Sequence, residues 1–181
     1  MNYGKDFEEL VARAADLEVQ SHSGKVGPGD VFCAIQGGKV DGAAFIPDAL
    51  RRGAAWIVAG PGAVLPEGAA ARLVTVADPR QALGVLAAAR HATNAPGLDI
   101  VGVTGTNGKT TVAFMIEHLL NGCGRRVGLI GTVSVRWPGH SHEAGMTTPD
   151  LLDIHQALRG MRQAKADTAI MEVSSHALEQ R

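Results

Sequence analysis

The chain has 181 residues, of which 45% are hydrophobic and 19% charged, with a formal net charge of -1 at pH 7. These values are typical of a soluble globular protein with one or two domains. The balanced charge gives no general attraction for nucleic acid or an anionic membrane, so we expect neither partner. No apolar run approaches the ~20 residues that span a bilayer, and no secretory leader is visible, so we expect a cytoplasmic protein. Cys33 and Cys123 lack metal-ligand spacing and are expected to be two buried free thiols.

The first half of the chain alternates short apolar runs with a helical pattern, which is typical of βαβ units and a parallel sheet. A second helix is expected to start at Pro79, with Asp78 as its cap and Gln81 completing a capping box. It ends at a turn-rich Asn-Ala-Pro-Gly stretch that marks a domain boundary. The expected strands are 31–35, 55–58 and 73–76, with a short helix at 45–50.

The second half repeats the pattern more strongly. Strand 100–103 runs into a glycine-rich loop, and the following helix has one apolar face formed by Val112, Met115, Ile116, Leu119 and Leu120. Strands are expected at 127–130 and 168–171, with a turn at 137–139 that leaves His140 and His142 in a turn. Thr148 is expected to cap a helix that Pro149 opens.

The expected fold class is α/β. A small N-terminal α/β domain is followed by the first part of a mostly parallel central ATPase sheet that contains a phosphate-binding loop. Only about three strands of this second sheet are visible, whereas such sheets have about five, so we expect the sheet to be incomplete. The expected organisation is an N-terminal domain over 1–94, a linker over 95–98 and a second domain over 99–181.

The loop at 105–110, Gly-Thr-Asn-Gly-Lys-Thr, carries the most specific chemistry. Gly105 and Gly108 let backbone N–H groups turn toward phosphate oxygens, and the helix that follows directs its positive end to the same place. Lys109 supplies a full positive charge, and the Thr110 hydroxyl can ligate Mg²⁺. The general pattern has a further glycine where this chain has Val103. The alternative is a plain glycine turn with an incidental lysine, which the flanking strand and amphipathic helix argue against.

Two further polar sites follow predicted strands or precede a helix. Glu172 ends an apolar strand at the carboxyl edge of the sheet, where open α/β folds bind ligands and where a carboxylate suits Mg²⁺. The other interpretation is a strand-end glutamate that faces solvent. Thr147 and Thr148 suit either a helix cap or a substrate contact. His176 beside two serines lacks an acid partner and a nucleophile elbow, so a serine hydrolase is not indicated.

These motifs together resemble the Mur ligases, which build the peptide of bacterial peptidoglycan. The ATP loop of that family is similar to residues 101–111, and the family also lacks the early glycine. Residues 131–133, 145–150 and 171–178 narrow the resemblance to the UDP-N-acetylmuramoyl-L-alanyl-D-glutamate ligases, which add the third residue of the stem peptide. The resemblance is strong from about residue 100 onward and looser before it.

The resemblance implies ATP and Mg²⁺ as cofactors, Lys109 as a catalytic residue, and Thr110 and Glu172 as metal ligands. The implied ATP-binding residues are Gly105, Thr106, Asn107, Gly108, Lys109, Thr110 and Thr111. The implied contacts to the UDP-sugar dipeptide are Ser23, Gly38, Lys39 and Val40 in the first domain, and Thr147, Thr148, Ser174 and Gln180 in the second.

One departure concerns the UDP site. The family usually has Asp-Ser-Arg where this chain has His22-Ser23-Gly24, which removes a strong, geometrically fixed donor. Lys25 or Lys39 are alternative sources of positive charge.

The implied reaction is ATP-dependent phosphorylation of the D-glutamyl carboxylate, followed by attack of the amine of a diamino acid on the acyl phosphate. The diamino acid is expected to be meso-diaminopimelate rather than lysine. The family also carries a carbamylated lysine and a C-terminal domain, neither of which lies within these 181 residues, so we expect no turnover by this chain alone. The alternatives are a non-catalytic nucleotide-binding module, or a related ATP-dependent ligase such as folylpolyglutamate synthetase.

Overall fold

The computed structural model describes residues 3–37, 40–175 and 177 of the chain. The chain divides into two compact units, Met1–Ala92 and Thr93–Arg181. The boundary lies two residues before the predicted end of the first domain. The predicted linker 95–98 lies within the second unit, where the Arg162 guanidinium donates to the carbonyls of Ala95 and Pro96 at 2.6 and 3.1 Å.

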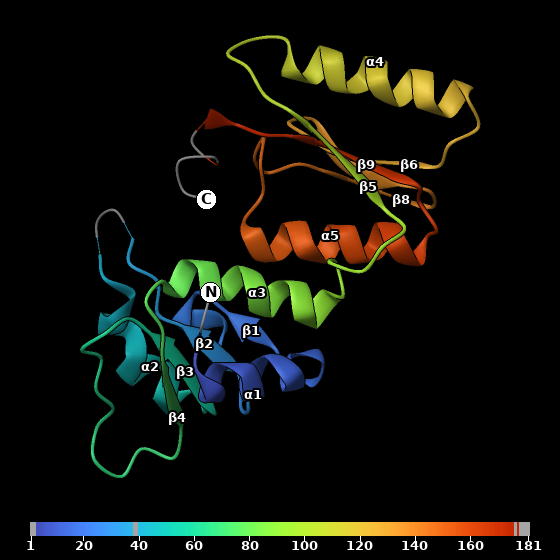
Figure 1. The fold of residues 1–181 in the computed structure, drawn as a ribbon. Coiled ribbons are helices and arrows are strands. Elements are labelled where there is room, and N and C mark those ends of the chain that lie inside the picture. Colours follow the sequence, from blue (N-terminus) through green and yellow to red (C-terminus); the bar gives the residue numbers. More distant parts are fainter. Residues whose placement is uncertain (1–2, 38–39, 176, 178–181) are drawn as a thin grey trace. The chain divides into compact units, whose positions relative to one another are not determined.

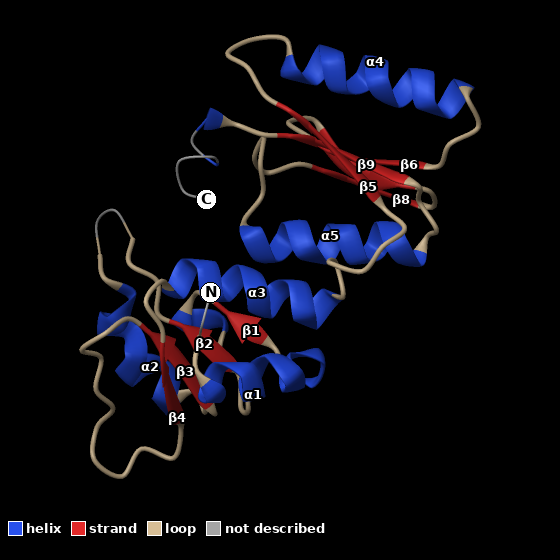
Figure 2. Ribbon diagram, in the orientation of Figure 1, coloured by secondary structure: helices blue, strands red, loops and turns tan. Residues whose placement is uncertain are grey.

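The first unit contains a four-stranded sheet in which every pair of neighbours is parallel (Figures 1 and 2). The strands lie in chain order as β1 (Val19–Gln20), β2 (Val31–Cys33), β3 (Trp56–Ala59) and β4 (Arg72–Thr75). The helices are α1 (Lys5–Arg13), α2 (Ile46–Arg51) and α3 (Pro79–His91), with short 3₁₀ turns η1 (Ala14–Asp16), η2 (Ser23–Lys25) and η3 (Gly42–Phe45).

Alternation of side chains along β2 and β3 builds a core on each face of this sheet. Phe32 and Ile57 belong to a cluster with Ile46 and Ala49 of α2. α3 contacts β1, β2 and β3 and buries the residues that the sequence pattern places on its apolar face. The cap of α3 was predicted correctly, because the Asp78 carboxylate accepts hydrogen bonds from the backbone N–H groups of residues 80 and 81 at 3.0 and 3.1 Å.

The second unit contains a five-stranded sheet with α4 (Lys109–Gly122) on one face and α5 (Leu151–Gln163) on the other (Figure 1). The strand order is β5-β9-β6-β7-β8. β9 pairs in parallel with both β5 and β6, whereas β7 pairs antiparallel with β6 and β8 pairs antiparallel with β7. The bounds are β5 (Asp99–Val103), β6 (Val127–Ile130), β7 (Ser134–Trp137), β8 (His140–Glu143) and β9 (Thr168–Glu172).

The sheet therefore has more strands than the sequence pattern predicted. The additional pair is the β7–β8 hairpin, whose two-residue turn is Pro138-Gly139. The predicted turn is present, but His140 and His142 lie on β8 rather than in the turn, and that expectation was wrong. β8 escaped prediction because all of its residues are exposed and polar, so it has no apolar alternation.

Two glycines let α5 approach the sheet closely. A Cβ on Gly128 of β6 would lie 2.4 Å from the sulfur of Met161, and a Cβ on Gly160 would lie 2.6 Å from the Trp137 ring. α5 starts at Leu151 with Asp150 at its N-cap, so the prediction that Thr148 caps this helix and Pro149 opens it was wrong.

The apolar face predicted for α4 is only partly buried. Ile116 and Leu120 pack with the fully buried Ala113 against the sheet. Val112, Met115 and Leu119 form an adjacent stripe that is 44, 59 and 66% exposed. Within the described residues, no helix combines the length and apolar character needed to cross a membrane.

Candidate nucleotide-binding site

The glycine-rich loop joins the carboxyl end of β5 to the first turn of α4. Gly105 has φ 145° and Gly108 has φ 79°, values that side chains rarely allow. Gly108 is also the N-cap of α4, and no side chain caps the helix there, so its first backbone N–H groups remain available to an anion. All seven residues predicted to bind ATP lie in this loop and the first helical turn, and none is buried.

The Lys109 side chain folds back onto the glycine-rich loop, where it is expected to bind phosphate. Its Nζ donates to the carbonyl oxygen of Gly105, four residues earlier, at 2.8 Å. This bond holds the ammonium group at the mouth of the loop. An incoming phosphate oxygen would exchange a neutral acceptor for a charged one, which forms a stronger hydrogen bond.

Glu172 is the only acidic side chain that is fully buried among the residues described, with 0% exposure. It ends β9, which pairs with β5 on one side and β6 on the other. Its Oε2 accepts from the Thr110 hydroxyl at 2.8 Å and from the Thr132 hydroxyl at 3.0 Å, and its Oε1 accepts from the Thr132 backbone N–H at 3.0 Å. No lysine or arginine of the described part of the chain forms an ion pair with it.

A buried carboxylate without a cation is costly, even when it accepts hydrogen bonds. The hydroxyl of Thr110 and the carboxylate of Glu172 supply adjacent oxygen donors, which Mg²⁺ prefers. The two residues therefore fit the metal predicted for them. The sheet places them together because the ends of neighbouring parallel strands share one edge.

Gly131 and Thr132 belong to a segment that carries the family resemblance, but neither was predicted as a site residue. Gly131 follows β6, and a Cβ there would lie 2.3 Å from Glu172 Oε1, so the carboxylate occupies the space of a side chain. Thr132 supplies two of the three hydrogen bonds to that carboxylate. The available signal was a small residue and a hydroxyl directly after a buried strand, at the same sheet edge as the loop.

Three of the predicted substrate residues, Thr147, Thr148 and Ser174, lie near the same strand end. The Thr147 hydroxyl lies 3.2 Å from that of Thr132. The Thr148 hydroxyl donates to the backbone carbonyl of Glu172 at 3.1 Å and accepts from the backbone N–H of Ser174 at 3.1 Å. Thr148 thus ties two segments together instead of capping α5.

In the first unit, Ser23 starts η2 and Val40 is 52% exposed in a loop closed by a hydrogen bond from the Gly37 N–H to the Val40 carbonyl at 3.0 Å. The pKa of Asp48 is lowered mainly by a side-chain hydrogen bond with Ser23 and, to a smaller extent, by one with Arg52. Arg52 Nη1 also donates to the carbonyl of Gly24 at 3.4 Å. Gly38, Lys39 and Gln180, which were also predicted to contact substrate, lie outside the described residues.

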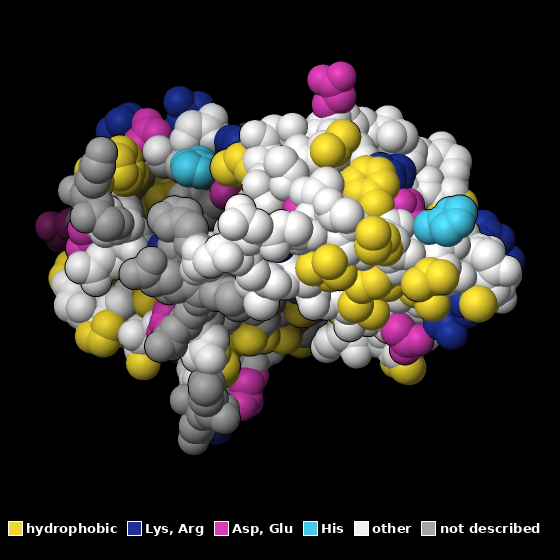
Figure 3. Space-filling view, turned by 90° about the horizontal axis from the view of Figure 1, so that it is seen from above, with side chains coloured by type: hydrophobic (Ala, Val, Ile, Leu, Met, Phe, Trp, Pro, Cys, Tyr) yellow, Lys and Arg dark blue, Asp and Glu magenta, His cyan; other side chains and the backbone are white. Residues whose placement is uncertain are grey.

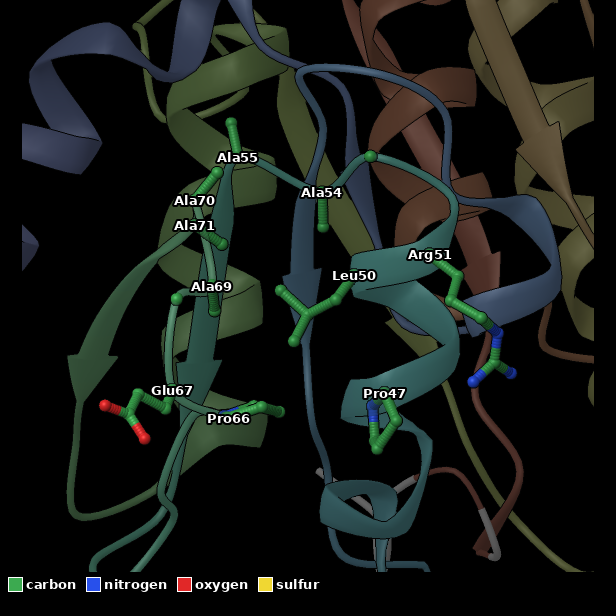
Figure 4. Close-up of a pocket in the computed structure, with 12 residues that line it drawn as sticks. Pro47, Leu50, Arg51, Ala54, Ala55, Pro66, Glu67, Ala69, Ala70 and Ala71 are labelled. Carbon is green, nitrogen blue, oxygen red and sulfur yellow. The ribbon is translucent and has the colours of Figure 1, made fainter.

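A pocket of about 610 Å³ lies elsewhere in the first unit, between α2 and the segment before β4. Its lining is mostly alanine, proline and glycine. Figure 4 shows Leu50 pointing across it, whereas the charged groups of Arg51 and Glu67 point away. A ligand site needs a few convergent polar groups, and this pocket has none aimed into it.

Two family models match the chain. Residues 18–91 match the model described as "Mur ligase family, catalytic domain", and residues 103–181 match "Mur ligase middle domain". The chain is 50% identical over 159 residues to a UDP-N-acetylmuramoyl-L-alanyl-D-glutamate–2,6-diaminopimelate ligase of Lawsonia intracellularis, covering 88% of this chain and 33% of that protein. It is 44% identical over 171 residues to the protein of the same name in Mesorhizobium japonicum, covering 93% of this chain and 35% of that protein.

Solved structures agree with the sequence matches. The structure of a UDP-N-acetylmuramoyl-L-alanyl-D-glutamate–2,6-diaminopimelate ligase aligns with a TM-score of 0.73 at 29% identity, over 90% of this chain and 33% of that one. A MurF ligase of Thermotoga maritima in complex with ADP aligns with a TM-score of 0.57 at 27% identity, over 95% of this chain and 34% of that one. The chain spans about a third of the length of these relatives. The predicted α/β class is confirmed, and the chain belongs to the Mur ligase family.

Proposed function

We propose that this chain is the ATP-binding and UDP-substrate-binding part of a ligase that adds 2,6-diaminopimelate to UDP-N-acetylmuramoyl-L-alanyl-D-glutamate. The observation that carries the proposal is the buried Glu172 carboxylate, held beside the phosphate loop by Thr110 and Thr132. The names of the relatives favour 2,6-diaminopimelate over lysine. The setting of this biosynthetic step is the cytoplasm.

The nucleotide half of the site uses groups that are already oriented. The backbone N–H groups from Gly105 to Thr111 bind the phosphates, and Lys109 adds charge on the outer ones. Thr110 and Glu172 hold Mg²⁺, which supplies neutralisation of the charge that builds up on the transferred phosphoryl group. The chain thereby positions and stabilises the phosphoryl group rather than forming a covalent bond with it.

The acceptor half of the proposed site uses residues near the same strand end. Thr147, Thr148 and Ser174 lie close to Glu172, and the hydroxyls of Thr147 and Ser174 suit the carbonyl and carboxylate oxygens of the dipeptide. The Thr148 hydroxyl donates to the Glu172 carbonyl, so Thr148 would have to release this bond in order to donate to the substrate. Ser23, Gly38, Lys39 and Val40 of the first unit, together with Gln180, complete the proposed contacts to the UDP-linked substrate. Arg52, which donates to the Gly24 carbonyl, and Lys25, the next residue along the chain, are two described cations where the resemblance expects an arginine.

Binding of the two substrates tests the proposal directly. We expect MgATP and UDP-N-acetylmuramoyl-L-alanyl-D-glutamate each to raise the melting temperature, since a ligand that binds only the folded state stabilises it by about 2.7 kcal/mol at 100 times its Kd. Lys109→Ala should lose the MgATP shift and keep the shift with the UDP-linked dipeptide. The control is Lys165→Asn, which removes a cation from the same unit at a position of φ 56° that asparagine tolerates.

Each outcome separates the alternatives. Stabilisation by MgATP without any response to the UDP-linked dipeptide would point to a nucleotide-binding module or to a folate ligase. Equal MgATP shifts in the wild type, Lys109→Ala and Lys165→Asn would contradict the proposal that the glycine-rich loop binds ATP through Lys109. The assay measures binding and not turnover because the chain spans about a third of its relatives.

A further inference from the structure

A pair of histidines lies on β8, outside the candidate nucleotide-binding site. His140 and His142 are two residues apart on this strand, so both side chains point to the same face of the sheet. β8 is the last strand in the order β5-β9-β6-β7-β8, and both residues are exposed. Solvent and ions therefore reach the two imidazole rings.

The neighbouring strand fixes one of these rings. Trp137 of β7 lies directly opposite His140, and the two rings stack with centroids 4.1 Å apart and planes 17° from parallel. Trp137 is itself held over Gly160 of α5. The orientation of His140 is thus set by a packed indole, which lowers the entropy that a ligand must remove.

The ring nitrogens of the pair converge. His140 Nε2 and His142 Nδ1 are 3.1 Å apart. A metal ion bonded to two imidazole nitrogens at about 2.0–2.1 Å holds them about 2.9 Å apart at a right angle and about 3.4 Å apart at a tetrahedral angle. The observed separation lies between these values, so one ion can bridge both nitrogens once each ring turns to direct its lone pair at the ion.

The nearest arginine on the hairpin does not oppose a cation at this place. Arg136 lies next to Trp137 on β7, so its side chain points to the other face of the sheet. There its guanidinium bonds Glu117 of α4 at 2.6 and 2.9 Å and stacks over Phe114 at 4.4 Å. The face that carries the histidines is therefore spared the charge of that residue.

We propose that His140 Nε2 and His142 Nδ1 bind one divalent transition-metal ion, of the class that prefers imidazole (Cu²⁺, Ni²⁺ or Zn²⁺). No third His, Cys, Asp or Glu joins them among the described residues, so water fills the remaining coordination positions. The ion takes the place of the hydrogen bond between the two rings and links two residues of the edge strand β8. This site is independent of the proposed ligase function and takes a different class of cation from the Mg²⁺ of the loop.

Trp137 provides a built-in reporter, because bound Cu²⁺ quenches a nearby indole. The chain has two tryptophans, and the other, Trp56, lies in the first unit. We expect saturable quenching by Cu²⁺ at one ion per chain, displaced by Zn²⁺ and unaffected by Mg²⁺. His140→Gln and His142→Gln should each weaken binding at least about tenfold, because the second imidazole binds intramolecularly.

His118→Gln is the matched control, since His118 is an exposed histidine on α4 of the same unit. It should bind Cu²⁺ like the wild type, and the two hairpin variants should keep the wild-type melting temperature without metal because their side chains are exposed. Zn²⁺ calorimetry on the same proteins gives a readout that needs no tryptophan. The proposal is overturned if the double variant His140→Gln/His142→Gln binds Cu²⁺ and Zn²⁺ as tightly as the wild type, or if the wild type shows no saturable binding.

Discussion

α3 of the first unit and α4 of the second both have clear apolar patterns in the sequence, but they bury them differently. α3 buries Ala82, Leu83, Leu86 and Ala87 to 4% exposure or less. α4 fully buries only Ala113 and leaves Val112, Met115 and Leu119 exposed. Figure 3 looks onto the side where α4 lies and shows hydrophobic side chains gathered at that surface.

The difference reflects what each helix packs against. α3 contacts three strands as well as α1 and η1, so its apolar face is enclosed. α4 rests on β5, β6 and β9, which cover one stripe of the helix and not the adjacent one. A spacing of three and four residues therefore predicts a helix, whereas the depth of burial depends on neighbours that the pattern does not contain. In the second unit, one fully buried position is occupied by the charged residue Glu172 and not by an apolar residue.

The largest expected effect contrasts a leucine from each helix. Leu86→Ala should lower the free energy of unfolding by about 2–5 kcal/mol, because it leaves a cavity in a closed core. Leu119→Ala should change it by less than about 0.5 kcal/mol, because that side chain is 66% exposed. Urea denaturation followed by circular dichroism measures both. Similar losses for the two variants would show that the exposed stripe of α4 is covered in solution.

A smaller effect is expected from Gly131→Ala. The residue has no positive φ, so the added methyl group is harmful only because it displaces the Glu172 carboxylate from its three hydrogen bonds. Overpacking of this kind costs about 1–3 kcal/mol. We also expect the variant to lose stabilisation by MgATP, measured as a thermal shift. Gly145→Ala is the control, because no atom lies within 4 Å of a Cβ there, and a wild-type MgATP response in both variants would contradict the role of Gly131.

The helix caps give a contrast of about 1 kcal/mol. Asp78→Ala removes the two hydrogen bonds that cap α3 and should cost about 0.5–2 kcal/mol. Asp150→Ala at the N-cap of α5 should cost less than about 0.5 kcal/mol, because that side chain makes no capping bond. Chemical denaturation of the two variants at the same pH measures the difference. Equal losses of stability in the two variants would mean that the negative charge at the helix N-terminus, and not the capping hydrogen bond, stabilises these helices.

The smallest effect on stability, but a clear chemical one, concerns the two thiols. Both thiols are free and Cys33 is buried, but Cys123 is exposed, so the prediction that both are buried was wrong for Cys123. Burial raises the pKa of Cys33 to about 12. At pH 8 a thiol reagent should modify Cys123 in the folded chain and reach Cys33 only on unfolding. Quantification of reacted thiols with and without denaturant checks this, and two fast thiols in the folded chain would contradict it.

The raised pKa of Cys33 also makes the free energy of unfolding depend on pH. Because the folded state holds the Cys33 proton more tightly, this contribution is fully present below the unfolded pKa near 9 and is lost as the pH rises toward 12. Cys33→Ala should flatten the decline in this interval, measured by denaturation at a series of alkaline pH values.

Much of the fold could be predicted because its strands are short apolar runs and its helices have recognisable starts. Asp78 and Pro79 marked the start of α3, and the glycine loop marked the junction of β5 and α4. The hairpin strand β8 could not be predicted, since its four residues are exposed and none is apolar. Thr148 was misassigned as a cap because a Thr-Pro pair suits a helix start, and only the tertiary structure shows the hydroxyl bonded to Glu172 and Ser174.

The site was predictable where one segment contains the chemistry and not where several segments meet. The loop from Gly105 to Thr111 is contiguous, and the position of Glu172 follows from its place at a strand end. The contributions of Gly131 and Thr132 depend on the register that brings β6 beside β9. Local sequence carries no information about a carboxylate on a distant strand that fills the space of an absent Cβ. The roles of these residues in binding remain predictions for the experiments above.

Glu172 interacts through both its side chain and its main chain. The carboxylate accepts a hydrogen bond from Thr110 in the glycine-rich loop, and the carbonyl of the same residue accepts one from Thr148, a proposed substrate contact. We therefore expect a nucleotide at the loop and a substrate at Thr148 to share one anchor, so that a shift of this strand end alters both sets of contacts. Linkage requires such cooperativity to be reciprocal: the factor by which a nucleotide changes the affinity for the acceptor equals the factor by which the acceptor changes the affinity for the nucleotide.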